Sequence, residues 1–268
     1  MSAAARRTIA PLGRRLGEVE ANRAAGAYCV LEIADAGGPA PRPGQFYMLA
    51  THGRWGGGEA ERPFLPRAFS FLRAGDGRLE FLLEDVGPGT HRLAELRSGD
   101  GLWLTGPLGI GFARPEDGRA PVLVGGGIGI VPLAGWQDEV GGPALLGFRS
   151  AAHAEAAALL ADPDVATDDG SVGHHGPVTD LLAESLDADP HAVVYACGPP
   201  AMLEAVRALC HGRGVSAQLA MESGMACGFG ACFGCVVPTR QGYVRLCLDG
   251  PVLDAADLET ALVAGAGH

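Results

Sequence analysis

The chain has 268 residues and a formal net charge of −11; 47% of its residues are hydrophobic and 19% are charged. This apolar content excludes disorder as the overall state, although the chain holds 42 glycines and 19 prolines. The negative charge argues against a nucleic-acid partner, because binding to phosphates depends on Lys and Arg. We expect an α+β multidomain protein of three modules, residues 1–115, 116–215 and 216–268.

Residues 1–115 are predicted to form an antiparallel β-barrel domain. Short apolar or alternating runs at 28–33, 45–49, 67–72 and 78–86 are separated by glycine- and proline-rich turns. Several short strands with frequent turns and one short helical run, at 91–97, are typical of a small barrel or sandwich.

Within this domain, Arg67-Ala68-Phe69-Ser70 lies on one of the expected strands. Alternate side chains share a face of a strand, so Arg67 and Phe69 point the same way. An arginine there can pair with a diphosphate while the aromatic ring covers a flavin, although an ordinary exposed strand has the same pattern. The sequence Gly87-Pro-Gly89-Thr90 then precedes a helical run, where backbone N–H groups suit a pyrophosphate.

Residues 116–215 are predicted to form an α/β domain. Strand-like runs at 122–124, 144–148 and 191–196 alternate with helical runs at 151–161, 178–186 and 201–210, which indicates a parallel sheet. The uncharged stretch 120–137 is long enough to cross a membrane, but its glycines and prolines favour a strand, a turn and a helix start. We therefore expect no membrane partner.

Two turns in this domain are candidates for holding a nucleotide. The first follows the strand at 122–124 and contains Gly125, Gly126, Gly127 and Gly129. It is not a Rossmann fingerprint, but it lies at the carboxyl end of a parallel strand, where nucleotides usually bind. The second is Cys197-Gly198-Pro199. Its proline is typical of an ordinary helix start, and the alternative is that Cys197 faces a nicotinamide.

The last module carries Cys227, Cys232, Cys235 and Cys247, in the order C-x4-C-x2-C followed by a fourth cysteine. This is the plant-type ferredoxin pattern for a [2Fe–2S] cluster. Buried free cysteines are one alternative. Zinc is the other, although structural zinc sites usually use two close pairs. Seven cysteines without an evident disulfide framework favour the cytoplasm.

From about residue 16 onward these motifs, in this order, resemble the ferredoxin–NADP reductase superfamily. Within it the chain is similar to electron-transfer subunits of class 1B, NAD-dependent dihydroorotate dehydrogenases. The resemblance implies FAD, a [2Fe–2S] cluster on the four cysteines, and NAD as co-substrate. It implies that FAD is bound by the run Arg67 to Ser70, by Leu82, Leu83 and Glu84, and by Gly89 and Thr90. Phe69 stands where tyrosine is usual.

The resemblance also implies an oxidoreductase subunit of pyrimidine (UMP) biosynthesis. Electrons would come from the FMN of a dihydroorotate dehydrogenase catalytic subunit, which holds the dihydroorotate site, in a heterotetramer of two of each subunit. Two alternatives stay open: the FAD/[2Fe–2S] subunit of an NADH-dependent ferredoxin:NADP oxidoreductase, and a stand-alone iron–sulfur carrier. The former generally has an aspartate where Cys227 stands.

Overall fold

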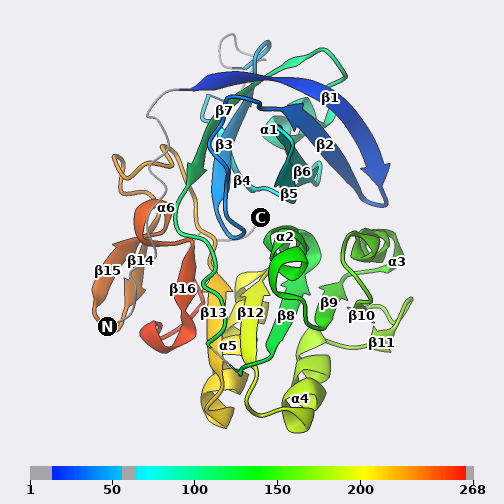
Figure 1. The fold of residues 1–268 in the computed structure, drawn as a ribbon, viewed down its shortest axis with the longest axis vertical. Coiled ribbons are helices and arrows are strands. Elements are labelled where there is room, and N and C mark those ends of the chain that lie inside the picture. Colours follow the sequence, from blue (N-terminus) through cyan, green and yellow to red (C-terminus); the bar gives the residue numbers. More distant parts are fainter. Residues whose placement is uncertain (1–13, 56–63, 117, 264–268) are drawn as a thin grey trace.

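The computed structural model describes residues 14–55, 64–116 and 118–263. They form two seven-stranded sheets, one above the other in Figure 1, with a small hairpin segment beside both. None of the described helices is long and apolar enough to cross a membrane.

The upper sheet is antiparallel and forms a partly open barrel, as expected for the first module. Its order is β4-β3-β7-β1-β2-β6-β5, which leaves β4 and β5 as edges. Tyr47, Phe71 and Phe81 fill the interior, with the other two rings edge-on to Tyr47. The sequence pattern missed β1 and β7. The strands are β1 (Arg15–Ala25), β2 (Tyr28–Ala34), β3 (Phe46–Thr51), β4 (Arg67–Ser70), β5 (Arg73–Gly75), β6 (Arg78–Leu83) and β7 (Gly101–Leu108), and helix α1 (Pro88–Ala94) contacts β3 and β6.

The lower sheet has the order β11-β10-β9-β8-β12-β13-β16 and is parallel except for β16, which confirms the expected α/β architecture. Helices follow β8, β9, β11 and β12, and because these strands are parallel their carboxyl ends share one edge of the sheet. The strands are β8 (Pro121–Gly126), β9 (Ala144–Phe148), β10 (Asp164–Thr167), β11 (His174–His175), β12 (Val193–Cys197), β13 (Ser216–Ala220) and β16 (Val252–Asp254); the helices are α2 (Val131–Val140), α4 (Val178–Ala188) and α5 (Pro200–Arg213).

The single helix expected over 151–161 is instead a short helix α3 (Ala151–Ala154) followed by a 3₁₀ turn, η2 (Glu155–Leu159). The side chain of Gln137 explains where the turn stops. Its amide accepts a hydrogen bond from the N–H of Ala161 (2.8 Å) and donates one to the carbonyl of Ala161 (3.0 Å). Both backbone groups are thus removed from any helix.

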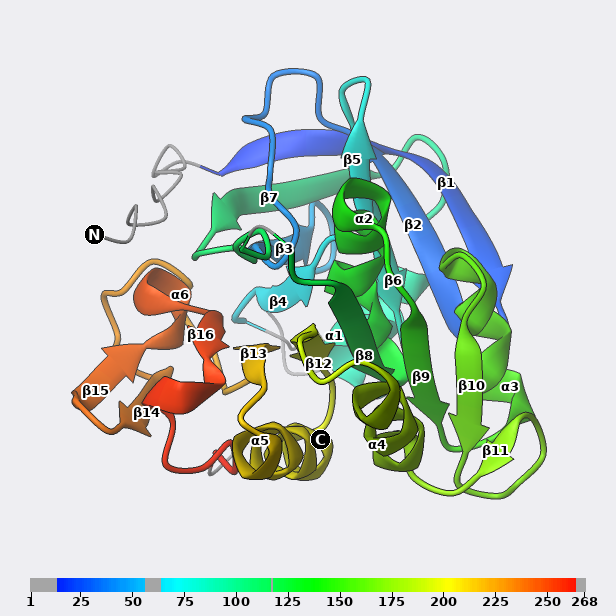
Figure 2. The same ribbon diagram turned by 60° about the horizontal axis from the view of Figure 1, so that its bottom comes forward.

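The C-terminal segment contains the hairpin β14 (Val236–Thr239) and β15 (Gly242–Arg245) and the short helix α6 (Leu246–Asp249). Figure 2 shows it as a unit beside the strands β13 and β16. These two strands lie in the range expected for the C-terminal module, yet β13 pairs with β12 and β16 pairs with β13. The lower sheet therefore continues past residue 215, because β13 follows α5 as one more parallel crossover.

Candidate functional site

The four C-terminal cysteines are arranged as two pairs. The sulfur atoms of Cys235 and Cys247 are 3.2 Å apart and both residues are buried. Cys227 is half-buried and hydrogen-bonds to the exposed Cys232. No three metal-ligating side chains among the described residues converge on a single ion. A [2Fe–2S] cluster needs two thiolates on each of two irons, so the paired arrangement fits it better than one tetrahedral zinc.

Backbone amides point at these sulfurs. The N–H of Gly234 donates to Cys232 Sγ (3.4 Å), and the N–H of Cys247 donates to Cys235 Sγ (3.5 Å). Burial raises the pKa of Cys227, but amides of the loop, beginning with that of Cys232, lower it to about 7 overall. Burial, and then the neighbouring Cys235 thiol, raises the pKa of Cys247 to about 12. Iron binding must therefore displace the proton of Cys247.

The cysteine loop packs directly on the β-barrel. Gly228 has a φ of +77°, and a Cβ there would lie 2.6 Å from Met48 Cγ on β3. Gly230 has a φ of +87°, and its Cβ would lie 2.3 Å from Leu248 Cδ1. Both positions thus require glycine. Met48 is also the cross-strand partner of Ala68 on β4, so the cysteine loop lies one strand away from the expected flavin strand.

Arg67 and Gly89, which belong to separate sequence motifs, meet in the structure. A Cβ on Gly89 would lie 2.7 Å from Arg67 Nε, so a side chain there would displace the guanidinium from its present position. Arg67 donates to the carbonyl of Leu65 (2.7 Å) and lies 5.9 Å from the centre of the Trp55 ring. Burial lowers the pKa of Arg67, and no described carboxylate is paired with it. A cation in this state fits a diphosphate at the start of α1.

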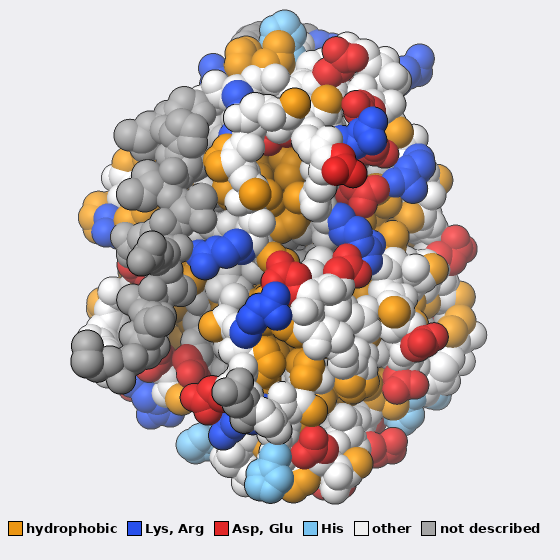
Figure 3. Space-filling model, in the orientation of Figure 1, with side chains coloured by type: hydrophobic (Ala, Val, Ile, Leu, Met, Phe, Trp, Pro, Cys, Tyr) orange, Lys and Arg blue, Asp and Glu red, His pale blue; other side chains and the backbone are white. Residues whose placement is uncertain are grey.

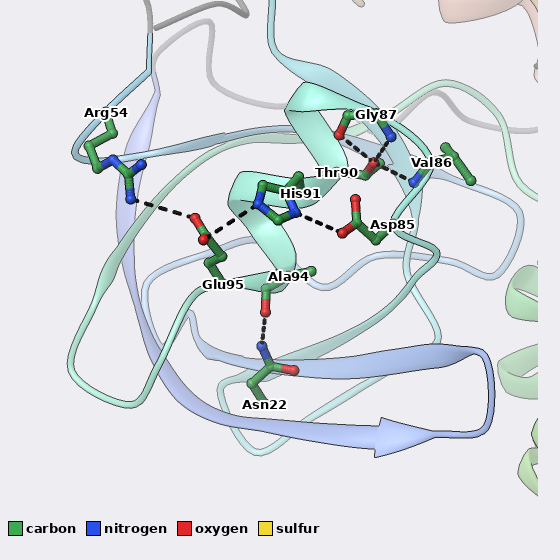
Figure 4. A network of polar contacts seen from close by, with 9 residues as sticks. All are labelled: Asn22, Arg54, Asp85, Val86, Gly87, Thr90, His91, Ala94 and Glu95. Atoms are coloured by element: carbon green, nitrogen blue, oxygen red, sulfur yellow. Dashed lines mark hydrogen bonds and ion pairs between the residues drawn. The ribbon is translucent and has the colours of Figure 1, made fainter. Parts of the chain in front are cut away.

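Thr90 has a structural task in the same place. Its hydroxyl accepts hydrogen bonds from the N–H groups of Val86 and Gly87, both at 2.9 Å, and so fixes the loop that enters α1 (Figure 4). In the next residue, His91, the Nδ1 atom lies 2.8 Å from Asp85 Oδ2, and this hydrogen bond raises the pKa of His91. The loop from β6 to α1 is therefore fixed by contacts from two residues of α1: Thr90 binds Val86 and Gly87, and His91 binds Asp85.

The other expected flavin residues divide by exposure. Ala68 is exposed on the edge strand β4, and Phe69 and Ser70 are half-buried. Ala68 and Ser70 share one face of the strand, whereas Phe69 shares the other face with Arg67 and packs against the barrel core. Leu82 and Leu83 have 1% and 0% of their surface exposed. Their side chains pack in the core, which leaves only backbone atoms for any contact with a cofactor.

Three of the four glycines in the first nucleotide turn serve close packing. A Cβ at Gly126 would lie 2.5 Å from Met202 Sδ, and one at Gly129 would lie 2.3 Å from the carbonyl of Cys197. Gly125 is enclosed by side chains at 3.0 Å and beyond. The fourth, Gly127, faces open space.

The second turn lies against the first. Cys197 pairs with Gly125 across β12 and β8, and a Cβ at Gly198 would lie 3.0 Å from Gly126 Cα. Pro199 precedes α5 as its N-cap. Cys197 is 3% exposed, and burial, followed by the charge of Glu222, raises its pKa well above the ordinary value. Its thiol therefore stays protonated and offers an apolar wall, not a nucleophile.

Sequence reasoning missed Glu222 and Ser223, which come directly after β13 at the carboxyl edge of the sheet. Glu222 is close enough to Cys197 to raise its pKa. The Ser223 hydroxyl is buried without a hydrogen-bond partner among the described residues. The available signal was their position immediately after a strand-like run, where parallel sheets place ligand contacts.

Charged side chains join the two sheets. Arg149, which follows β9, donates to Glu84 Oε1 at the end of β6 (2.6 Å). His153 Nε2 lies 2.9 Å from the same guanidinium. In the view of Figure 3, basic and acidic side chains meet across the middle of this face. Arg149 is thus engaged with the flavin-side domain and is not simply directed at solvent.

The iron–sulfur binding domain of dihydroorotate dehydrogenase B matches residues 222–259. The structure is similar to that of an NADH-dependent reduced ferredoxin–NADP oxidoreductase, with a TM-score of 0.75, 24% identity, and coverage of 92% of this chain and 91% of the other. A ferredoxin NADP⁺ reductase from Neisseria gonorrhoeae with bound FAD and NADP has a TM-score of 0.60 at 19% identity, covering 75% and 92%. Because both structures are less than 25% identical to this chain, the two similarities establish its fold.

Sequence relatives are more specific. The dihydroorotate dehydrogenase B (NAD(+)) electron transfer subunit of Caldanaerobacter subterraneus is 36% identical over 230 residues, covering 82% of this chain and 88% of the relative. That of Geobacillus kaustophilus is 38% identical over 234 residues, covering 81% and 86%. These relatives favour the first interpretation over the ferredoxin:NADP alternative. The chain belongs to the family of dihydroorotate dehydrogenase B (NAD(+)) electron transfer subunits.

Proposed function

We propose that this chain passes electrons from the FMN of a dihydroorotate dehydrogenase catalytic subunit, through a [2Fe–2S] cluster and FAD, to NAD⁺. The observation that carries this proposal is the contact between the cysteine loop and β3, one strand from Arg67 and Ala68. A cluster carries one electron at a time and NAD accepts a hydride, and a flavin between them exchanges electrons singly or in pairs.

The cluster would be held by Cys227, Cys232, Cys235 and Cys247. The first two lie nearer the surface and the last two are buried in the core that joins the loop to the nucleotide sheet. We infer that electrons enter on the exposed side, at Cys232, and leave toward the barrel at Gly228.

FAD would lie along β4 and the start of α1. Arg67 would pair with the diphosphate, Ala68, Phe69 and Ser70 would line the flavin, and Thr90 would hold the loop that leads into α1 through its hydrogen bonds to Val86 and Gly87. Leu82, Leu83 and Glu84 would contribute through the backbone, because the leucines are buried and the Glu84 carboxylate is paired with Arg149.

Replacing Arg67 with alanine is expected to weaken FAD retention. The variant loses a charge-assisted contact of about 1.5–3 kcal/mol, which corresponds to roughly 10- to 100-fold in affinity. The flavin-to-protein ratio after gel filtration measures the effect. Arg78→Ala is the matched control, because Arg78 on β6 is an exposed arginine paired with Glu20. Equal flavin retention in both variants would show that Arg67 is an ordinary strand residue.

NAD would bind at the carboxyl edge of the lower sheet. Its pyrophosphate would lie at the glycine turn of Gly125, Gly126, Gly127 and Gly129, and its nicotinamide beside Cys197, Gly198 and Pro199. The protonated Cys197 side chain would form part of the apolar surface that contacts the nicotinamide. In this arrangement residues 1–115 form the FAD domain, 116–215 with β13 and β16 the NAD domain, and the rest of 216–268 the cluster module.

An electron transfer subunit requires a catalytic partner, and we propose a heterotetramer of two chains of each kind in the cytoplasm, in the synthesis of UMP. The seven free cysteines support a reducing compartment.

The absorption spectrum of the purified chain tests the cofactor set. Flavin bands over iron–sulfur absorbance are expected, and cluster absorbance alone would favour a stand-alone carrier.

A further inference from the structure

Gly127 is the glycine of this turn, among Gly125, Gly126, Gly127 and Gly129, that has open space where a side chain would be. Its φ is +52°, and a Cβ there would have a single described atom within 4 Å, the hydroxyl oxygen of Tyr28 at 3.8 Å. The other glycines are enclosed by side chains or backbone at 3.0 Å or less. The turn is therefore open to a ligand at Gly127, and the open space is bordered by a residue of the barrel.

Tyr28 has a fixed ring and an unused hydroxyl. The residue is 4% exposed, and its ring meets the imidazole of His153 edge-on, with the centroids 5.7 Å apart. No described residue hydrogen-bonds to the hydroxyl, and its oxygen is not among the fully buried unpartnered atoms, so it stays accessible from the open side of Gly127. Burial, followed by the charge of Glu84, raises the pKa of Tyr28 to about 12, so the hydroxyl keeps its proton and can donate it.

Backbone contacts hold Tyr28 over the turn. The tip of the β1–β2 hairpin lies on α3 in Figure 1, where the N–H of Ala27 donates to the carbonyl of Ala152 (3.0 Å). At the same tip Gly26 has a φ of +62°, and a Cβ would lie 2.2 Å from that carbonyl oxygen. A side chain at Gly26 would therefore separate the two domains at this point.

We propose that Tyr28 is a dinucleotide-binding residue supplied by the flavin domain, and that its hydroxyl donates a hydrogen bond to the diphosphate of NAD lying against Gly127. This rests on the proposed function. Two charged side chains act on Tyr28, the Glu84 carboxylate and, more weakly, the Arg149 guanidinium; they are paired with each other at 2.6 Å, so the protonated hydroxyl is the group that Tyr28 itself offers to an anion. It follows that the NAD site is complete only when the β1–β2 hairpin is seated on α3.

The test is Tyr28→Phe in the full chain loaded with FAD and cluster, which keeps the ring and removes only the hydroxyl. Titration calorimetry with NAD⁺ and with ADP-ribose is expected to give dissociation constants about tenfold higher than wild type for both ligands, as for loss of one hydrogen bond to a charged group. The KM for NADH with an artificial acceptor rises by the same factor, with kcat unchanged. The matched control is Tyr195→Phe, whose hydroxyl donates to the carbonyl of Ala113 (2.9 Å), and it keeps wild-type affinity.

Three results would overturn the proposal: wild-type affinity in Tyr28→Phe, weakened binding of NAD⁺ but not of ADP-ribose, or loss of FAD or cluster from the variant. The second would place the contact on the nicotinamide, and the third would assign Tyr28 a structural role. A wild-type chain that binds neither NAD⁺ nor NADH would instead refute the proposed function.

Discussion

Replacing Cys232 with serine is expected to remove the [2Fe–2S] cluster and, with it, the coupling of dihydroorotate oxidation to NAD⁺ reduction. Cys232 is the most exposed of the four thiols and receives an amide hydrogen bond from Gly234. A serine oxygen is a poor substitute for a thiolate on iron. Replacing a residue that only hydrogen-bonds to a metal ligand typically lowers metal affinity or activity by roughly 10- to 100-fold. Because Cys232→Ser removes a direct ligand, we expect a larger loss of cluster and of coupled activity.

Iron content and the electron-spin resonance signal of the reduced protein measure this loss. Cys210→Ala is the control, because Cys210 is buried in α5 away from the cysteine loop. It should keep both signals. Unchanged iron and an unchanged signal in Cys232→Ser would exclude the cluster assignment.

The isolated chain is expected to oxidise NADH with an artificial acceptor and to leave dihydroorotate untouched. The described residues include Arg67 of β4, which lies beside the start of α1 and would bind FAD, and the glycine turn after β8, which would bind NAD. The proposed function places the dihydroorotate site on the catalytic subunit. The rate of NADH oxidation by the Cys232→Ser chain should remain near that of wild type, since this reaction needs only FAD.

Two assays on the purified chain check this division. Dihydroorotate turnover without the catalytic subunit would mean that the chain holds a substrate site of its own. Loss of NADH oxidation together with the cluster would mean that the cysteine loop is required to build the flavin site.

Much of the fold follows from local sequence. Alternating runs gave β2, β3 and β6, and the strand–helix alternation gave the parallel sheet with β8, β9 and β12. The long strand β1 was missed because only Gly17 and Val19 of its 11 residues are buried, so it has no strong apolar alternation. Likewise β10 and β11 are short strands at one end of the sheet; β10 pairs with β9 and β11 pairs with β10, and the local pattern does not reveal this pairing.

The site could be predicted where spacing alone defines chemistry, as with the four cysteines. It could not be predicted where contacts join distant segments. The meeting of Arg67 with Gly89, and of Tyr28 with Gly127, depends on how strands separated by many residues are placed. The contact of Arg149 with Glu84 is of the same kind, because the two residues lie in different domains.

The most direct test of the electron path is anaerobic, rapid mixing of dihydroorotate with this chain assembled on its FMN-containing catalytic subunit. Absorbance at cluster and NADH wavelengths is followed for the wild-type chain and for Cys232→Ser bound to the same subunit. The proposed path predicts cluster bleaching before NADH appears in wild type, and no NADH from the variant although the catalytic subunit's flavin is reduced. NADH formation at the wild-type rate by the assembled, cluster-free variant would contradict it.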